Sequence, residues 1–242
     1  MKEELKGKVA LVTGGGTGIG RAIAQRLAAD GISLALCGRD AARLEAVKAD
    51  AERLGVEAWV LQGDLTDDTF LFSCIEQTAA HFGGLDILIN NAGMALNCRL
   101  EDTQTEQFDR IMRLNVRAPY FLCRDALTWL KKSTHATVIN ISSVVGHKGY
   151  VQQSAYAASK HAVIGFTKSL ANEVYKDGIR VHVISPGGVY TDMVAIARPD
   201  LESDGMIMPE DIAEIAAFMI ENRGNAVIDE ICVHRVGKEP FA

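Results

Sequence analysis

The chain has 242 residues, of which 48% are hydrophobic and 23% are charged, a balance typical of a globular protein and too apolar for a disordered one. The formal net charge is −6, from 25 basic and 31 acidic residues, so we expect no nucleic-acid partner, which would require a basic surface. No apolar run approaches the roughly 18 residues of a membrane span, and the N-terminus lacks a signal-peptide pattern, so we expect a cytoplasmic protein with no membrane partner.

Short apolar runs alternate along the chain with longer segments of helical periodicity. The expected strands are Val9–Val12, Ser33–Cys37, Glu57–Gln62, Ile87–Asn90, Thr137–Ile141, Arg180–Ile184 and Val227–His234. The expected helices are Gly18–Ala29, Ala41–Leu54, Thr69–Phe82, Thr105–Leu130, Ser154–Lys176 and Pro209–Asn222. Most strand runs are apolar throughout, as in parallel strands buried on both faces. The alternation therefore predicts an α/β fold, a doubly wound and mostly parallel sheet with helices on both faces, in one domain spanning residues 1–242.

The cysteines and histidines lack the spacing of a disulfide framework or a metal site. The five cysteines are widely spaced and include no C-x-x-C pair: Cys37, Cys74, Cys98, Cys123 and Cys232. The histidines include no H-x-x-x-H or H-E-x-x-H set, so we expect no metal. We interpret the cysteines as small core side chains in a reducing compartment.

A glycine-rich segment, Thr13–Gly20, joins the first strand to the first helix. Gly14 permits a tight turn, Gly18 lets the backbone approach a ligand, and Gly20 lets the helix pack on the sheet. The free N–H groups and positive dipole end of the helix then suit a diphosphate. Because the spacing is G-x-x-x-G-x-G instead of G-x-G-x-x-G, an ordinary glycine-rich turn is the alternative.

The tip of the second strand carries a basic residue where a dinucleotide fold meets the adenosine ribose. An acid there selects NAD, whereas an arginine pairs with the 2′-phosphate of NADP. Gly38 stands where the acid is expected, and Arg39 follows it, so NADP(H) is favoured over NAD(H). A solvated surface arginine is the alternative reading. Asp64 and Leu65, after the third strand, are candidate adenine contacts or part of a helix N-cap.

Tyr156 and Lys160 begin a long helix and are spaced so that both lie on one face. A cation beside a phenol favours the phenolate and lowers its pKa from about 10, as a tyrosine acting as general acid or base at a carbonyl oxygen requires. Ser142 and Ser143 follow the fifth strand, where a hydroxyl can orient a substrate oxygen, although paired serines are also common in turns.

Two further segments follow strand ends. Asn90–Gly93 has small residues that leave room for a ligand over the sheet edge, or form an Asn-Gly-type turn. After the sixth strand, Pro186 and Gly187 form a turn, and Thr191 can hold a carboxamide. The absence of a G-x-S-x-G motif argues against a serine hydrolase.

Together these motifs resemble the short-chain dehydrogenase/reductase family, in order and at the family's spacing, from Lys8 to about Asn222. The resemblance implies a Rossmann-type seven-stranded sheet of order 3-2-1-4-5-6-7 and hydride transfer with NAD(P)(H). It implies that Tyr156 is the general acid or base and that Lys160 lowers its pKa and binds the nicotinamide ribose. It further implies that Ser143, 13 residues before Tyr156, orients the substrate oxygen, and that Asn115 supports a water relay to Lys160.

The same resemblance implies which residues bind the cofactor. Val189 and Thr191 are expected at the nicotinamide, and Asn91 near the first ribose. Thr17 stands where many NADP-preferring members carry a basic residue. The full predicted set is Gly14, Gly16, Thr17, Gly18, Ile19, Gly20, Arg39, Asp64, Leu65, Asn91, Ala92, Gly93, Tyr156, Lys160, Pro186, Gly187, Val189 and Thr191.

The resemblance indicates the type of reaction more specifically than it indicates the substrate. A 3-oxoacyl thioester is the leading expectation, and a small 3-hydroxy acid or amino alcohol is the alternative favoured by a short substrate loop at about 192–208 and an unusual C-terminus. A non-catalytic dinucleotide-binding regulator is the alternative of another class. A homotetramer or dimer is expected through Thr105–Leu130 and Ser154–Lys176. Candidates for the substrate pocket, from position, are Met94, His147, Tyr150, Gln153 and Tyr190.

Overall fold

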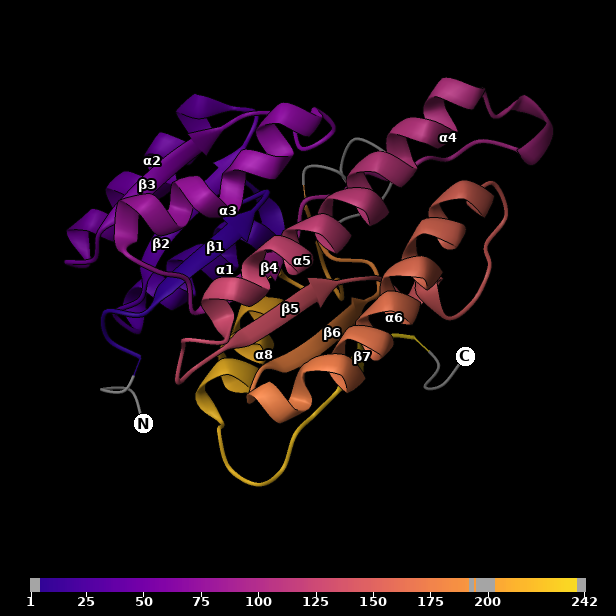
Figure 1. The fold of residues 1–242 in the computed structure, drawn as a ribbon. Helices are drawn as coiled ribbons and strands as arrows, with labels where there is room; N and C mark the ends of the chain where they lie inside the picture. Colours follow the sequence, from indigo (N-terminus) through magenta and orange to yellow (C-terminus); the bar gives the residue numbers. More distant parts are fainter. Residues whose placement is uncertain (1–4, 192–193, 195–202, 239–242) are drawn as a thin grey trace.

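The computed structural model describes residues 5–191, 194 and 203–238, so most of the substrate loop predicted at about 192–208 lies outside the described residues. The described chain contains a seven-stranded sheet with helices on both faces (Figure 1). The strands across the sheet are β3 (Ala58–Gln62), β2 (Ser33–Gly38), β1 (Val9–Thr13), β4 (Ile87–Asn90), β5 (Thr137–Ile141), β6 (Arg180–Pro186) and β7 (Glu230–Val233). Every neighbouring pair is parallel, which confirms the predicted order.

The helices form two layers, each with its own hydrophobic core. One core lies under α1 (Gly18–Ala29), α2 (Ala41–Arg53) and α8 (Pro209–Glu221). The other lies under α3 (Asp68–Phe82), α5 (Ala118–Leu130) and α6 (Ser154–Val174). Within β1, Ala10 and Val12 belong to the first core and Val9 and Leu11 to the second. Alternate side chains of a strand point to opposite faces, which explains why this strand is apolar at every position.

The helix expected over Thr105–Leu130 is built from three consecutive pieces. α4 (Thr105–Met112) continues into a π-helical turn, η3 (Arg113–Arg117), and then into α5. Pro119, at the start of α5, lacks the N–H that would donate to the carbonyl of Asn115 in an α-helix. Such a proline interrupts regular α-helical hydrogen bonding, and π turns inside helices are frequent at functional sites. The interruption places Asn115 in the π turn.

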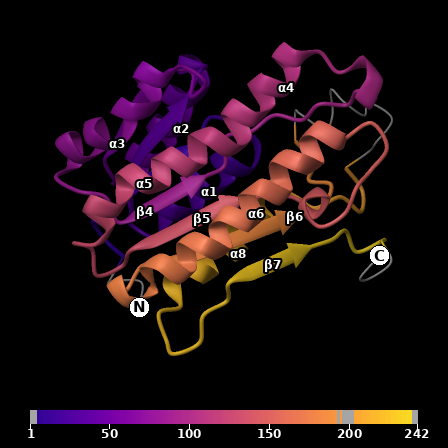
Figure 2. The same cartoon turned by 45° about the vertical axis from the view of Figure 1, so that its right-hand side comes forward.

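The edge strand β7 is shorter than the sequence pattern predicts. It pairs with β6 from Glu230 to Val233, whereas the apolar pattern extends over Val227–His234. Figure 2 shows β7 at the border of the sheet, beside β6. The cysteine on this strand, Cys232, is exposed and Cys98 is partly buried, so the expectation of core cysteines is wrong for Cys232. It is confirmed for Cys37, Cys74 and Cys123, which are buried.

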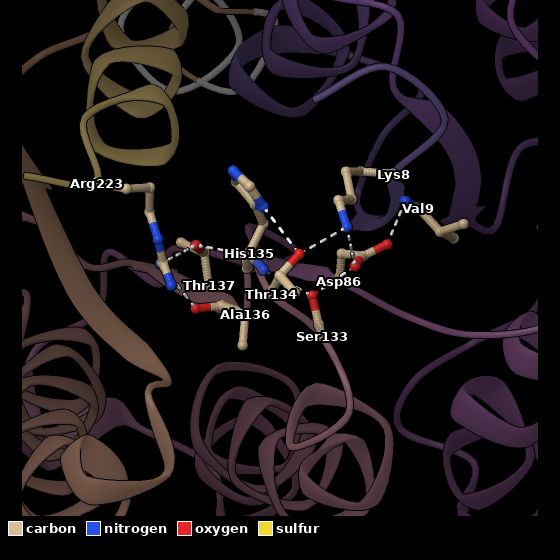
Figure 3. A network of polar contacts seen from close by, with 9 residues as sticks. All are labelled: Lys8, Val9, Asp86, Ser133, Thr134, His135, Ala136, Thr137 and Arg223. Carbon is tan, nitrogen blue, oxygen red and sulfur yellow. Dashed lines mark hydrogen bonds and ion pairs between the residues drawn. The ribbon is translucent and has the colours of Figure 1, made fainter. Parts of the chain in front are cut away.

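A polar network joins the N-terminal ends of the central strands (Figure 3). Asp86, just before β4, accepts a hydrogen bond from the backbone N–H of Val9 at 2.9 Å and pairs with Lys8 at 3.4 Å. Ser133, in the turn before β5, donates to the other carboxylate oxygen of Asp86. Arg223 donates to the carbonyl of Ala136 at 3.1 Å. These bonds fix the relative positions of β1, β4 and β5 at the edge opposite their carboxyl ends.

None of the helices in the described part of the chain is long and apolar enough to cross a membrane. The longest, α6, has 21 residues but carries Lys160 and Lys168 within its length.

Candidate active site

The carboxyl ends of β1, β4, β5 and β6 open into one cleft, bordered by the start of α1 and of α6. Most residues of the predicted site line it: Gly14, Thr17, Gly18, Ile19, Asn91, Ala92, Gly93, Ser143, Tyr156, Lys160, Pro186, Gly187, Val189 and Thr191. Met94, a predicted pocket residue, and Ser142, the other serine after the fifth strand, also line the cleft, as do Ile141 and Val194, which the sequence motifs did not assign to the site. Segments far apart in sequence thus meet at the edge where parallel α/β sheets bind ligands.

The glycine turn leaves no room for side chains. Gly14 and Gly18 have positive φ angles of 65° and 50°. A Cβ atom on Gly20 would lie 2.2 Å from the carbonyl oxygen of Gly14 and 2.4 Å from Nδ2 of Asn91. Asn91 also donates from Nδ2 to the carbonyl of Thr13 at 3.0 Å. The amide of Asn91 therefore holds the turn in place, as well as facing the cleft where the first ribose was predicted.

The N-terminus of α1 fits a diphosphate group. The helix begins at Gly18, and in the described structure the N-cap Thr17 makes no side-chain capping bond and the first turn carries no acidic residue. Its first N–H groups and dipole are therefore left to attract an anion. Gly16 belongs to the turn, and a Cβ atom on it would lie 3.3 Å from Cβ of Arg43. The expected role of the glycine motif in holding a dinucleotide thus fits the geometry.

The two serines after β5 point to different partners. Ser142 donates its hydroxyl to the backbone carbonyl of Lys160 at 3.1 Å, on α6. The Ser143 hydroxyl accepts from the N–H of Val145 at 3.2 Å, and its interaction with Tyr156 acts to lower the pKa of that phenol. Of the two serines, Ser143 is therefore the one that influences the phenol, and its role in orienting a substrate oxygen stays a prediction.

The charge of Lys160 is buried without a carboxylate in direct contact among the described residues. The residue is 6% exposed, and its ammonium donates to the carbonyl oxygen of Ile141 at 2.9 Å. Burial penalises the charged form and lowers the pKa of Lys160 to about 8. The ammonium lies 5.8 Å from the ring centroid of Tyr156, on the face of α6 that the spacing predicted.

The phenol of Tyr156 is shifted in the direction opposite to the one expected from its lysine neighbour. Burial raises the pKa of Tyr156, and the hydrogen bond with Ser143 opposes that shift only in part. The ammonium of Lys160 is directed to the carbonyl of Ile141, so it does not contact the hydroxyl. Tyr156 is accordingly protonated at neutral pH, the form in which it can donate a proton.

Asn115 fixes the loop after β4 to α6. Its Oδ1 accepts from the N–H of Met94 at 2.9 Å, and its Nδ2 donates to the carbonyl of Met94 at 2.9 Å and to Oγ of Ser159 at 3.0 Å. Ser159 in turn donates to the carbonyl of Tyr156 at 2.7 Å. Asn115 lies outside the cleft lining, so the water relay to Lys160 stays a prediction. Ser159 was missed from the sequence, although its position three residues after Tyr156 places it on a neighbouring part of the helix.

Arg39 and its neighbours form the outer end of the predicted site. Arg39 is exposed after β2, while Asp40 is used as the N-cap of α2, accepting from the N–H of Arg43 at 3.2 Å. Burial acts to raise the pKa of Asp64, but hydrogen bonds from Thr66 and the charge of Arg39 hold it below its usual value.

Asp64 and Leu65, which follow β3, lie in different surroundings. The N-cap of α3 is Asp67, whose N–H donates to the carbonyl of Asp64 at 2.9 Å, so Asp64 lies in the turn that leads into the helix without capping it. Leu65 is 5% exposed and belongs to the core under α3. Among the described residues, its side chain is part of that core and is absent from the cleft lining. An adenine contact by Asp64 or Leu65 stays a prediction.

Comparison with known proteins gives relatives over most of the chain. A family model described as short chain dehydrogenase matches residues 8–202. The chain is 38% identical over 195 residues to a 3-oxoacyl-acyl-carrier-protein reductase of Escherichia coli strain K12, covering 81% of this chain and 79% of the relative. It is 34% identical over 224 residues to carbonyl reductase family member 4 of Xenopus tropicalis, covering 89% and 92%. A solved short chain dehydrogenase from Burkholderia cenocepacia J2315 in complex with NADP matches at a TM-score of 0.86 and 35% identity, covering 96% of this chain and 97% of that one.

Lys160→Met should stabilise the protein at neutral pH while removing a site residue. The folded pKa of about 8 lies below the ordinary 10.5, so the unfolded chain binds more protons between these values and the wild type gains stability as pH rises through them. Below pH 8 the buried charge costs at most about 3 kcal/mol, from which the lost hydrogen bond to Ile141 subtracts about 1 kcal/mol. Thermal melts at pH 7 and pH 10 should show a larger gain at pH 7.

The control is Lys176→Met, which replaces an exposed lysine after α6 and should not shift the melting temperature in a pH-dependent way. A Lys160→Met variant less stable than wild type at pH 7 would show that burial of this charge is not a net cost.

Proposed function

The chain belongs to the short-chain dehydrogenase/reductase family of oxidoreductases, and from this premise we propose that it transfers a hydride between NADP(H) and a ketone or secondary alcohol. The observation that carries the proposal is the meeting of Ser143, Tyr156 and Lys160 in one cleft with the glycine turn. NADP(H), when bound, supplies or accepts the hydride. The residues of the chain then have to bind the carbonyl oxygen and move one proton.

Tyr156 is proposed as the proton donor to the carbonyl oxygen in the direction of reduction. Negative charge develops on that oxygen as its carbon is reduced, and the hydroxyl of Ser143 is placed to donate a hydrogen bond to it. Because burial raises the pKa of Tyr156, its hydroxyl carries the proton at neutral pH. Lys160 is protonated below its pKa of about 8, and its positive charge stabilises the tyrosinate that remains after proton transfer. Near neutral pH the pair therefore holds the proton that the direction of reduction consumes.

Arg39 is proposed to select NADP(H) over NAD(H). It is exposed at the tip of β2, and its backbone carbonyl accepts from Nε2 of Gln62 at 3.2 Å, which fixes the strand tip beside β3. The neighbouring Asp40 is engaged by Arg43, both as a helix cap and in an ion pair of 3.3 Å. Its charge is thus partly neutralised, which favours an anion beside Arg39. The NADP complex of the Burkholderia relative supports the same preference.

The substrate proposed first is a 3-oxoacyl thioester. The support is the resemblance to the Escherichia coli 3-oxoacyl-acyl-carrier-protein reductase over 81% of this chain. The relative named as a carbonyl reductase supports a carbonyl substrate more generally. A small 3-hydroxy acid or amino alcohol is the second candidate, because the segment between Thr191 and Pro209 is short.

A homo-oligomer is proposed through the segments 105–130 and 154–176. Rings on these segments gather at the surface, where Tyr120 is 52% exposed and makes edge contacts with Phe121 and Phe166. The guanidinium of Arg117 lies 5.0 Å from the ring centroid of Phe121. Exposed aromatic and arginine side chains are enriched in protein interfaces. Sedimentation velocity measures the mass of the assembly, and a monomer at all concentrations would contradict this proposal.

Tyr156→Phe tests the proposed reaction. Removal of a general acid lowers turnover by about 10²–10⁴-fold, while cofactor binding should change little because the ring remains. Steady-state NADPH oxidation with acetoacetyl-coenzyme A, a 3-oxoacyl thioester, measures kcat and KM, and small 3-oxo acids and amino ketones test the alternative substrates. Tyr175→Phe, an exposed tyrosine beyond the end of α6, is the control. Near-wild-type turnover in Tyr156→Phe would refute the acid–base role, and cofactor binding without turnover on any carbonyl would favour a non-catalytic regulator.

Arg39→Ala tests the cofactor preference. A charged hydrogen bond contributes about 1.5–3 kcal/mol, so NADPH should bind about 10- to 100-fold more weakly to the variant, with NADH binding unchanged. Fluorescence titration of both cofactors measures this difference. Arg53→Ala, an exposed arginine at the end of α2, is the control. If wild-type protein binds NADH as tightly as NADPH, the assignment of Arg39 is wrong.

A further inference from the structure

Three side chains with metal-binding atoms meet beside the edge strand β7. His147 follows the short helix η4 (Val144–Gly146), and Glu230 and Cys232 lie on β7. Their donor atoms, Nε2, a carboxylate oxygen and Sγ, all lie within 4.8 Å of one another. We propose that His147, Glu230 and Cys232 form a binding site for Zn²⁺, separate from the proposed proton-transfer residues.

The sheet itself brings the three donors together. Glu230 and Cys232 are two residues apart on β7, so both side chains leave the same face of the strand. Cys232 is in register with Ser185 of β6, and the Ser185 hydroxyl lies 3.3 Å from Nε2 of His147. The imidazole therefore lies over the β6–β7 pair. Two of the three donors are held by a hydrogen-bonded strand, which reduces the conformational entropy lost when an ion binds.

The distance between the imidazole and the thiol matches that between neighbouring ligands of a zinc ion. Zinc bonds of about 2.0–2.3 Å in a tetrahedral arrangement place neighbouring donors about 3.3–3.8 Å apart. Nε2 of His147 lies 3.4 Å from Sγ of Cys232, within that range. The same Nε2 lies 2.7 Å from Oε1 of Glu230, so the carboxylate has to move outward by a fraction of an ångström to admit the ion.

The carboxylate of Glu230 has one oxygen without a hydrogen bond in the described structure. Oε1 is buried, and although it lies close to the imidazole it accepts no well-directed hydrogen bond. The other oxygen, Oε2, pairs with Lys168 of α6 at 3.5 Å. Lys168 thus orients the carboxylate and leaves Oε1 directed to His147 and Cys232. A bound cation would give this buried oxygen the partner it lacks.

The donor types match zinc chemistry. A neutral imidazole, a carboxylate and a thiolate are its ordinary protein ligands, and three of them leave a fourth position for water. When the Zn–S bond forms, the thiol of Cys232 releases its proton to solvent. The two anionic ligands then balance the charge of the ion, and the ammonium of Lys168 stays on the second carboxylate oxygen.

A hydrolytic triad of Ser185, His147 and Glu230 fits the same residues less well. A catalytic triad uses the two ring nitrogens of histidine, one toward the serine and the other toward the acid. Here Ser185 and Glu230 both approach Nε2 of His147, which cannot serve both roles at once. The Ser185 hydroxyl, the Glu230 carboxylate and the Cys232 thiol all lie close to one ring nitrogen of His147, as ligand atoms that surround a shared ion do.

A bound ion would connect the segment between Ser143 and Tyr156 to the edge strand β7. His147 lies between Ser143 and Tyr156 in sequence, and β7 follows α8 near the C-terminus. Zinc would therefore tie the connection that precedes Tyr156 to a strand more than 80 residues later in the chain. It would act as a structural cross-link, and the free energy of unfolding would rise with the logarithm of the zinc concentration above the dissociation constant.

Isothermal titration of the full chain with ZnCl₂, after removal of metals by a chelator, tests the site. We expect one ion per chain in the wild type. His147→Ala and Cys232→Ser should each bind zinc at least about 10- to 100-fold more weakly. In metalloproteins generally, that loss of affinity follows even when only a residue hydrogen-bonded to a metal ligand is removed. His161→Ala and Cys98→Ser are matched controls, a second exposed histidine and a second accessible cysteine, and should bind as the wild type does.

Thermal melts give a second readout that does not depend on turnover. Zinc should raise the melting temperature of the wild type and of both controls, and leave that of Cys232→Ser unchanged. Titration with CoCl₂ should give a thiolate-to-cobalt absorption band in the wild type that Cys232→Ser lacks. The proposal is overturned if the wild type binds no zinc at millimolar ZnCl₂, or if the control variants lose zinc as strongly as His147→Ala and Cys232→Ser.

Discussion

Parallel strands bring their carboxyl ends to one edge of the sheet, and strand pairing holds the turns of the candidate site there. Four strands end at this edge, so the turns that follow them face a common cleft: β1 at Thr13, β4 at Asn90, β5 at Ile141 and β6 at Pro186. The glycine turn packs so closely that Gly20 has backbone 2.2 Å from where a Cβ would stand. The polar network around Asp86 at the opposite edge fixes the same strands. The sheet is thus the rigid support on which a site of loops and helix ends depends.

Burial of one cation sets the electrostatics of this cleft. Lys160 donates to the carbonyl of Ile141, and burial lowers the pKa of its ammonium to about 8, with no carboxylate among the described residues in contact to oppose that shift. The same burial raises the pKa of Tyr156. A neutral phenol beside this cation can give up a proton, and the cation then stabilises the resulting anion. Burying the cation costs folding stability when no ligand is bound. Asn115 of the π turn donates to Ser159 of α6, which donates to the backbone carbonyl of Tyr156, so the two segments are joined beside the phenol.

Local patterns in the sequence predicted a large part of this arrangement. The alternation of apolar runs and helical segments predicted the α/β sheet, and its continuous apolar strands reflect two cores, as Val9–Val12 shows. The resemblance to the family added the strand order, which the pairing confirms. Two boundaries were predicted less well. The helix over Thr105–Leu130 is interrupted at a π turn that precedes Pro119, a local signal that the helical periodicity alone did not reflect. The length of β7 depends on its pairing with β6, which covers fewer residues than the apolar pattern.

The sequence by itself determined the order of the elements, the glycine turn and the shared face of Tyr156 and Lys160, because each depends on residues within one turn, strand or helix. The tertiary structure decided which serine reaches Tyr156, the direction of its pKa shift and the partners of Asn115, because these depend on burial and on contacts between distant segments. It also brought His147 to Glu230 and Cys232, where spacing along the chain had indicated no metal. Those donors lie up to 85 positions apart, and only the pairing of β6 with β7 makes them neighbours.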